Sequence, residues 1–213
     1  RGGMLFEVMS IQGMSEALVS DINGELINTY KQVKSHTDDL LDELQILENK
    51  FIERTYEEKV DFYKSILFRY RHLCHSTRTD TDIQRAAMFL FLDAASYITH
   101  MTGNGYLVTA GGTEIILPKQ VMKLSRVCDE RTIRICARLL QNVQIRRCDF
   151  RECLGFVDDK TLLYLDPPLV TEKKETAYPF TEKDMQSVLS IDKIARSLGA
   201  EVILSQKVHS KQK

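Results

Sequence analysis

The chain has 213 residues, of which 43% are apolar and 28% are charged, and its formal net charge is −1. With only 10 glycines and 4 prolines, the composition excludes collagen-like, low-complexity and wholly disordered proteins. No window contains the roughly 18 consecutive apolar residues of a membrane-spanning helix, and the N-terminal residues lack the basic and apolar regions of a signal peptide. We therefore expect a soluble, globular, cytoplasmic protein.

The cysteines indicate a reducing environment and argue against a metal site. Five cysteines cannot all pair, and none lies in a Cys-x-x-Cys motif, so reduced thiols are expected. The segment His72-Leu73-Cys74-His75 contains metal-ligating side chains, but no second cluster of matching spacing completes a tetrahedral site. No metal is expected.

The first half of the chain is predicted to be mostly helical. A short apolar run at 17–20 ends at Asp21, and the residues after it carry apolar side chains at helical spacing, which predicts a strand, an acidic residue and a helix. Residues 37–50, 55–73 and 82–101 also carry apolar side chains every three or four positions, so each is predicted to form a helix.

The second half alternates between strands and helices. The predicted elements, in chain order, are two short strands at 106–109 and 114–117, a helical region from Pro118 to about Leu140, a strand at 143–147, a strand at 161–165, a helix near 181–198 that Thr181 caps, and a strand at 201–204. Strands that alternate with helices are typical of a mostly parallel sheet with helices on its faces. The predicted fold class is therefore α/β.

Charge is unevenly distributed along the chain. Acidic residues outnumber basic ones over 1–68, whereas 119–151 contain three acidic residues and nine basic ones, namely Lys119, Lys123, Arg126, Arg131, Arg134, Arg138, Arg146, Arg147 and Arg151. Such a basic segment attracts a polyanion such as nucleic acid even when the total charge is near zero. The alternative is that Arg131, Arg134 and Arg138, spaced by three and four, form only the solvated face of a helix.

The most distinctive motif is Asp166-Pro167-Pro168-Leu169, which follows the apolar strand predicted at 161–165. The two prolines remove two backbone donors and stiffen the turn. Ligands of open parallel sheets bind outside the carboxyl ends of the strands, so Asp166 lies where a binding site is expected. A strand that ends in Asp-Pro is also compatible with a simple turn.

Together with Ser20-Asp21-Ile22-Asn23-Gly24 upstream, this motif resembles the Dam-type, or alpha-group, family of S-adenosylmethionine-dependent adenine-specific DNA methyltransferases. The other matching segments follow the family's order, namely Arg1-Gly2-Gly3-Met4-Leu5-Phe6, the helix with Arg85-Ala86-Ala87, and Asp149-Phe150 after a strand. The resemblance implies an incomplete Rossmann-like methyltransferase sheet with a mostly helical target-recognition insert. It assigns residues 1–50 and 119–213 to the cofactor-binding catalytic domain and 51–118 to the insert.

The resemblance implies which residues contact the S-adenosylmethionine cofactor. Gly2 and Gly3 match the end of a glycine loop that lets the backbone approach the methionine portion of the cofactor. Asp21 matches the carboxylate that accepts hydrogen bonds from the ribose hydroxyls, a role that suits a side chain with two acceptor oxygens. Asp149 and Phe150 match a pair near the adenine of the cofactor, where an aromatic ring packs on the base.

The resemblance also implies how the target adenine is held. Asp166, which also borders the cofactor, and the carbonyl of Pro167 match the acceptors for its amino group. That group is a poor nucleophile because its lone pair is delocalised into the ring, so two acceptors would aim it at the methyl donor by positioning and electrostatics. The implied catalytic set is Asp166, Pro167, Pro168 and Leu169, with double-stranded DNA as partner and DNA contacts from Tyr97, Thr99, Arg134 and Arg138.

Two motifs depart from the family pattern. Leu169 stands where the family has tyrosine or another aromatic residue that stacks on the flipped adenine. Stacking on an aromatic ring is worth about 1 to 3 kcal/mol, so its loss would slow turnover by roughly one to two powers of ten. The family's Tyr-Asn-Gly is replaced by Tyr97-Ile98-Thr99.

Two other functions therefore remain alternatives. The first is a catalytically impaired relative that acts as a DNA-binding or partner subunit. The second is a methyltransferase for another planar amide, such as a glutamine side chain, but those families carry Asn before the two prolines, where this chain has Asp166.

In the family, the central strand of the sheet comes before the glycine motif, and two further strands come after the segment that ends at Gln206 here. We expect the sequence to be a fragment of a longer chain, because the neighbouring parallel strands would otherwise lose a ladder partner. The alternative is that another segment or chain fills the gap. A restriction endonuclease partner, as in restriction-modification systems, is a further expectation from the resemblance.

Overall fold

The computed structural model describes residues 3–11, 16–76, 82–95, 126–168, 170 and 180–205. Its helices and strands form two compact units. The described residues of the first unit lie in 3–95 and 126–148, and those of the second unit lie in 149–205.

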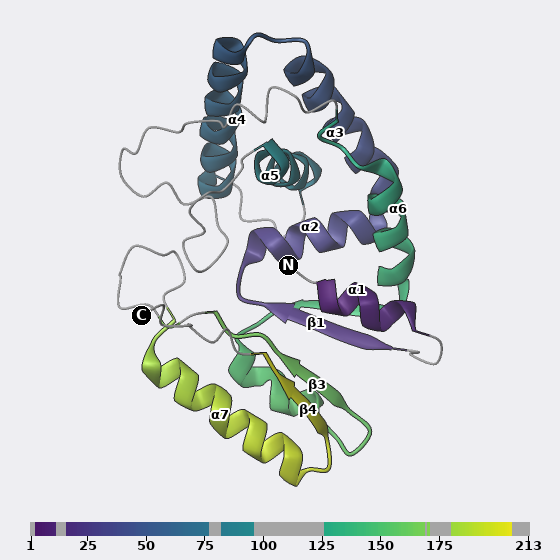
Figure 1. Cartoon of the computed structure of the whole chain (residues 1–213), viewed down its shortest axis with the longest axis vertical. Helices are drawn as coiled ribbons and strands as arrows, with labels where there is room; N and C mark the ends of the chain where they lie inside the picture. The colour runs from purple at the N-terminus through teal and green to yellow at the C-terminus, as the bar shows by residue number, and fades with distance from the viewer. Residues whose placement is uncertain are drawn as a thin grey trace, which may run out of the picture. The chain divides into compact units, whose positions relative to one another are not determined.

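The first unit consists of helices and one parallel pair of strands. Its elements are α1 (Gly3–Ser10), β1 (Ala17–Asp21), α2 (Gly24–Ser35), α3 (Thr37–Ile52), α4 (Tyr56–Ser76), α5 (Ile83–Ala95), α6 (Glu130–Leu139), the 3-10 helix η2 (Leu140–Asn142) and β2 (Val143–Arg147). The register of the parallel pair places Asp21 opposite Arg147. Helix α5 packs against α2, α3 and α4 (Figure 1), so it lies at the centre of this unit.

The core of the first unit is built from the apolar faces of these helices. On α3, Leu40, Leu44, Leu47 and Phe51 recur at helical spacing and are buried. The ring of Phe51 meets that of Phe91 on α5 edge to face, with centroids 5.3 Å apart. This packing explains why the periodicity of the sequence predicts the helices of this unit.

Polar side chains connect α2 to the start of α5. The buried amide of Asn28 donates from Nδ2 to the carbonyl oxygen of Asp82 at 2.9 Å and accepts the Asp82 N–H at 2.8 Å. Nearby, Nε of the buried Arg85 lies 3.3 Å from Oε2 of Glu25. Two motifs that are far apart in the sequence are therefore joined by a buried polar network.

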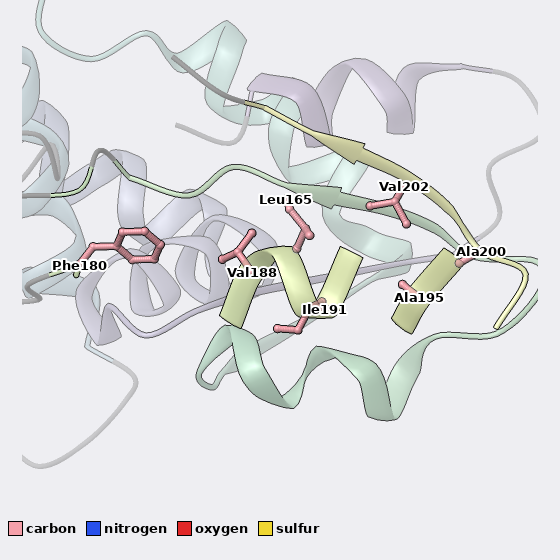
Figure 2. Packing of buried hydrophobic residues seen from close by; sticks show 7 residues of the cluster. All are labelled: Leu165, Phe180, Val188, Ile191, Ala195, Ala200 and Val202. Atoms are coloured by element: carbon pink, nitrogen blue, oxygen red, sulfur yellow. The ribbon is translucent and has the colours of Figure 1, made fainter. Parts of the chain in front are cut away.

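The second unit contains the 3-10 helix η3 (Phe150–Phe156), β3 (Leu162–Leu165), α7 (Glu182–Ser197) and β4 (Glu201–Leu204). Strands β3 and β4 are parallel, with Leu165 opposite Leu204. Figure 2 shows the core, in which Leu165 and Val202 from the strands face Val188, Ile191 and Ala195 of α7. At the carboxyl ends of the two strands, the Ser205 N–H donates to the Leu165 carbonyl at 2.8 Å. This hydrogen bond holds the two ends together.

Local signals define both ends of α7. The Thr181 hydroxyl accepts the Asp184 N–H, and the Asp184 carboxylate accepts the Thr181 N–H at 2.7 Å, which is a capping box. After the helix, Gly199 has a φ of 93°, a conformation that favours glycine, and a Cβ there would lie 2.9 Å from Cβ of Asp159. The chain therefore turns directly from α7 into β4.

The α/β class and most predicted elements are confirmed. Within a few residues, the predicted strands at 17–20, 143–147, 161–165 and 201–204 are β1, β2, β3 and β4, the helix predicted after Asp21 is α2, and the helices at 37–50, 55–73 and 181–198 are α3, α4 and α7. The predicted helix 82–101 is confirmed as α5 up to Ala95, and its remainder lies outside the described residues, as do the strands predicted at 106–109 and 114–117. Helix α1 and the 3-10 helix η3 are elements that the sequence patterns did not predict.

The helical region predicted from Pro118 to Leu140 is wrong for residues 126–129. Helix α6 begins only at Glu130, because the Asp129 carboxylate caps it by accepting the Thr132 N–H at 3.1 Å. The N–H groups of Val127 and Cys128 point instead to the Glu48 carboxylate on α3. Residues 118–125 lie outside the described residues.

The described residues contain neither a membrane-spanning helix nor a cluster of metal-ligating side chains. None of the helices described is both long and apolar enough to cross a membrane. Within the same ranges, no group of three His, Cys, Asp or Glu side chains is arranged to hold a metal ion.

Candidate active site

Asp21 lies at the carboxyl end of β1, where the turn into α2 begins. Its Oδ1 accepts the Asn23 N–H at 2.7 Å, and Oδ1 of Asn23 accepts the Glu25 N–H at 3.0 Å as the cap of α2. Within the described residues, no hydrogen bond to Oδ2 of Asp21 is present. One carboxylate oxygen is thus held by the turn, and the other is free to accept a hydrogen bond.

Burial sets the electrostatics around Asp21. It raises the pKa of the Asp21 carboxyl group, and the hydrogen bond from Asn23 acts in the opposite direction. The pKa of Tyr30 on α2 is raised to about 12 by burial and by the negative charges of Asp21 and Cys136. The carboxylate therefore lies in a poorly solvated environment, where a hydrogen bond from a ligand gains strength.

Arg147, at the end of β2, lies beside this turn. A Cβ on Gly24 would be 3.0 Å from the guanidinium carbon of Arg147, so the absence of a side chain at Gly24 lets the arginine pack over the start of α2. Nε of Arg147 also donates to the Ile22 carbonyl at 3.4 Å. The sequence patterns did not reveal this neighbour, because only the strand register places Arg147 opposite Asp21.

Asp166 follows directly after β3 and is exposed. Within the described residues its side chain makes no hydrogen bond or ion pair, whereas Pro167 and Pro168 after it are half-buried. Asp166 thus lies at the carboxyl end of the β3–β4 pair, the end of a parallel sheet at which ligands bind. Leu169 lies outside the described residues.

Asp149 and Phe150 form the start of η3 in the second unit. The Asp149 carboxylate caps η3 by accepting the Arg151 N–H at 2.9 Å, and the capping box is completed by Glu152. The Phe150 ring packs against the core and lies 6.2 Å from the Phe180 ring between centroids. Residues that the sequence predicted to be neighbours of the cofactor thus occupy a well-defined local structure.

The structure places the predicted site residues in both units. Asp21 and Gly3 belong to the first unit, and Asp149, Phe150, Asp166, Pro167 and Pro168 belong to the second. Gly3 is the first residue of α1, where a Cβ would meet no atom within 4 Å, so packing does not require a glycine there. Gly2, Tyr97 and Thr99 lie outside the described residues.

The two arginines predicted to bind DNA are in different environments on α6. Arg134 pairs with Glu130 at 2.8 Å and with Asp38 on α3 at 2.7 Å. Arg138 is exposed and, within the described residues, its side chain makes no hydrogen bond or ion pair. Both line a hollow of about 900 Å³ between α3 and α6. The charge of Arg134 is thus largely neutralised, and that of Arg138 is not.

Comparison with known proteins identifies the class of protein. A model of the D12 class N6 adenine-specific DNA methyltransferase family matches residues 2–205. The chain belongs to this family of DNA adenine methyltransferases, which are transferases that use a methyl donor.

Two relatives give the same result. The type II methyltransferase M.MjaIII of Methanocaldococcus jannaschii is 29% identical over 212 residues, covering 96% of this chain and 70% of that protein. The type II methyltransferase M1.LlaDCHI of Lactococcus lactis subsp. cremoris is 25% identical over 214 residues, covering 96% of this chain and 68% of that protein.

Proposed function

We propose that this chain transfers a methyl group from S-adenosylmethionine to the exocyclic amino group of adenine in DNA. The observation that carries the proposal is the position of Asp166, an exposed carboxylate at the carboxyl end of β3, followed by two prolines in a family of adenine methyltransferases. A carboxylate in this position is an acceptor for an amino group, and the rigid prolines hold it in place.

The Asp21 turn fits the ribose of S-adenosylmethionine. Oδ2 of Asp21 is an acceptor without a hydrogen bond from the described residues, and ribose hydroxyl groups are donors. We assign Gly2 and Gly3 to the methionine portion of the cofactor, Asp149 and Phe150 to its adenine, and Asp166 to its boundary with the target base. When bound, the cofactor supplies an activated methyl group.

The residues after β3 orient the target base in this proposal. The Asp166 carboxylate and the Pro167 carbonyl accept the two hydrogens of the adenine amino group, which favours a pyramidal nitrogen whose lone pair is directed away from the ring. Pro168 keeps the turn rigid, and Leu169 offers apolar contact to the extruded base. The protein thus acts through positioning and electrostatics.

Replacing Asp21 by asparagine is expected to weaken the binding of S-adenosylmethionine while it raises the stability of the fold at pH 7. Loss of the charged acceptor weakens S-adenosylmethionine binding about 10- to 100-fold, to be measured by isothermal titration. Burial raises the pKa of Asp21 in the folded state above its value in the unfolded state. The protonated carboxyl group therefore contributes stability that is fully present below the unfolded pKa and is lost as pH rises through the folded pKa. Asp21→Asn therefore unfolds at a higher temperature than the wild type at pH 7, and the difference shrinks in acid.

The exposed Asp42 on α3 provides the matched control for this test. Asp42→Asn is expected to leave the affinity for S-adenosylmethionine unchanged. Wild-type affinity in Asp21→Asn would remove Asp21 from the proposed cofactor site.

We also propose that the target is double-stranded DNA and that residues 51–118 form the target-recognition insert, with Tyr97 and Thr99 in contact with DNA. In this division, residues 1–50 and 119–213 form the catalytic domain. The basic residues of α6 support a phosphate-binding role, with Arg138 as the principal contact and Arg134 as a contact that must compete with Asp38 and Glu130.

Arg138→Ala is expected to weaken DNA binding on the order of threefold to tenfold for all sequences, and to lower the salt dependence of binding by about one phosphate contact. Arg134→Ala has a smaller effect because two carboxylates already neutralise its charge. Fluorescence anisotropy with a labelled duplex across a salt series measures both, with Lys193→Ala on α7 as control. Unchanged affinity at low salt would show that Arg138 does not contact DNA and only belongs to the solvated face of α6.

The proposed reaction is tested by incubating the chain with methyl-labelled S-adenosylmethionine and duplex DNA, followed by nucleoside mass spectrometry. The expected product is N6-methyladenine. Label on cytosine or on protein, or the absence of transfer despite cofactor and DNA binding, contradicts the proposal.

Leu169 favours a second candidate, a catalytically impaired relative that acts as a DNA-binding or partner subunit. This candidate is favoured if S-adenosylmethionine and DNA both bind but no methyl group is transferred. Leu169→Tyr then shows whether a missing stacking platform is the cause.

We further propose that the chain acts in a restriction-modification system, since both relatives are named type II methyltransferases.

A further inference from the structure

Arg151 connects three features of the second unit. Its guanidinium group binds the Asp149 carboxylate through Nη1, at 3.0 Å to Oδ1 and 2.9 Å to Oδ2, and binds the Asp184 carboxylate through Nη2. The guanidinium carbon also lies over the Phe150 ring, 4.4 Å from its centroid. Asp149 and Phe150 are the two residues assigned above to the adenine of the cofactor.

We propose that Arg151 competes with a purine for Phe150 and Asp149, and that its displacement controls binding at the adenine end of the site. This inference rests on the proposed function, because it deepens the assignment of these two residues. It makes Arg151 a residue that sets the affinity of the site.

The chemistry of the two competitors is alike. A guanidinium group is planar, stacks on aromatic rings and presents N–H donors that match a carboxylate. An adenine ring is also planar, stacks on aromatic rings and presents an amino group as donor. Asp149 offers only two oxygens, and Arg151 contacts both of them. A purine that stacks on the same face of Phe150 and donates to Asp149 would therefore meet the guanidinium group.

Asp184 provides a second partner that keeps Arg151 bound after displacement. The Asp184 carboxylate belongs to the capping box of α7, and its pKa is lowered first by hydrogen bonds from Thr181 and then by Arg151. It therefore remains ionised over a wide pH range. Because Arg151 retains this ion pair when it leaves Asp149, the guanidinium group moves without losing all of its partners.

The exposure of the three side chains supports a movable contact. The Arg151 side chain is 45% exposed, whereas those of Asp149 and Asp184 are 31% and 19% exposed. The carboxylates are thus fixed by caps and partly covered, and the arginine lies over them at the surface. Ion pairs and cation-π contacts at such exposure are individually weak, so a ligand can displace them.

The test compares the wild type with Arg151→Ala and Arg151→Lys by isothermal titration with adenosine and with S-adenosylmethionine. Arg151→Ala is expected to bind adenosine roughly threefold to tenfold more tightly, and Arg151→Lys to lie between the two. Arg54→Ala is the matched control, because Arg54 lies 4.8 Å from the Phe62 ring centroid in the first unit, and its removal is expected to leave both affinities unchanged.

A second measurement follows the salt dependence of adenosine binding, first in the wild type and then in Arg151→Ala. Salt weakens the pair between Arg151 and Asp149, so the affinity of the wild type for the uncharged adenosine is expected to rise with salt. In Arg151→Ala this rise is absent. The measurement stands even where the substitution lowers the stability of the second unit.

The outcomes separate this inference from the proposed function. Tighter adenosine binding in Arg151→Ala, or binding that appears only in that variant, supports competition. Equal or weaker binding in the variant, with a wild type that binds S-adenosylmethionine, overturns the competition and leaves the proposed function intact. If neither protein binds either ligand, the cofactor assignment and this inference both fail.

Discussion

Replacing Asp166 by alanine is expected to lower the rate constant of methyl transfer by about 10²- to 10³-fold, with a smaller effect on the affinity for DNA. In the role proposed for Asp166, the carboxylate acts on the amino group where charge develops during the reaction, so its removal is comparable to the removal of one oxyanion-hole donor. Single-turnover transfer to duplex DNA, with S-adenosylmethionine in excess, measures the rate constant separately from binding.

The structure predicts that this substitution leaves the fold intact. Asp166 is exposed and, within the described residues, its side chain has no hydrogen bond to lose. The melting temperature should therefore stay within about 2 °C of the wild type. Asp159→Asn, an exposed carboxylate before the amino end of β3, is the matched control. Transfer at the wild-type rate in Asp166→Ala would mean that the Asp-Pro-Pro motif is only a turn.

The sequence predicted the backbone of the candidate site better than its side-chain partners. Asp21 and Asp166 were expected at the ends of strands, and both strands are present, because an apolar run followed by a carboxylate is a local signal. The cap of α7 was predicted for the same reason, since Thr181 and Asp184 are three residues apart. Signals of this kind depend only on neighbouring residues.

Contacts between distant residues could not be predicted in this way. Arg147 reaches Gly24 only through the register of β1 and β2, and Arg151 reaches Asp184 only because η3 packs against α7. Both arginines were counted in the basic segment, which indicated nucleic acid. In the structure Arg147 packs over the turn that follows Asp21, and Arg151 contacts Asp149 and Phe150, so part of the charge of this segment is engaged in local contacts.

The late start of α6 also results from a contact between distant residues, and the residue that makes it, Glu48, belongs to no motif. Glu48 on α3 is buried, with 7% exposure, and its Oε2 accepts the N–H groups of Val127 and Cys128, the latter at 2.6 Å. Its Oε1 accepts from Nε2 of Gln45 at 3.2 Å. A carboxylate nearly 80 positions upstream thus holds the segment that leads into α6, which no local pattern reveals.

Glu48→Ala is expected to destabilise the first unit by about 2 to 5 kcal/mol. The substitution leaves two backbone donors without their acceptor, and one of them belongs to Cys128, which is only 6% exposed. The melting temperature should fall by roughly 5 to 15 °C. Glu48→Gln retains the shape and one acceptor oxygen, so its effect should be about half as large. Chemical and thermal unfolding measure both, with Glu43→Ala on the same helix as control.

The reactivity of the Cys128 thiol shows whether the loss of stability in Glu48→Ala is confined to the segment before α6. Burial, and next the charge of Glu48, raise the pKa of that thiol, so the wild-type cysteine should react slowly with a thiol reagent. In Glu48→Ala the segment is released and the charge is absent, and labelling of Cys128, followed by peptide mass spectrometry, should accelerate far more than that of Cys153 in the second unit. A variant that melts within about 1 °C of the wild type, with unchanged Cys128 labelling, would show that α6 is held by other contacts. If α6 is released as expected, the DNA contact proposed for Arg138 should weaken in parallel, because that arginine depends on the same anchor for its position.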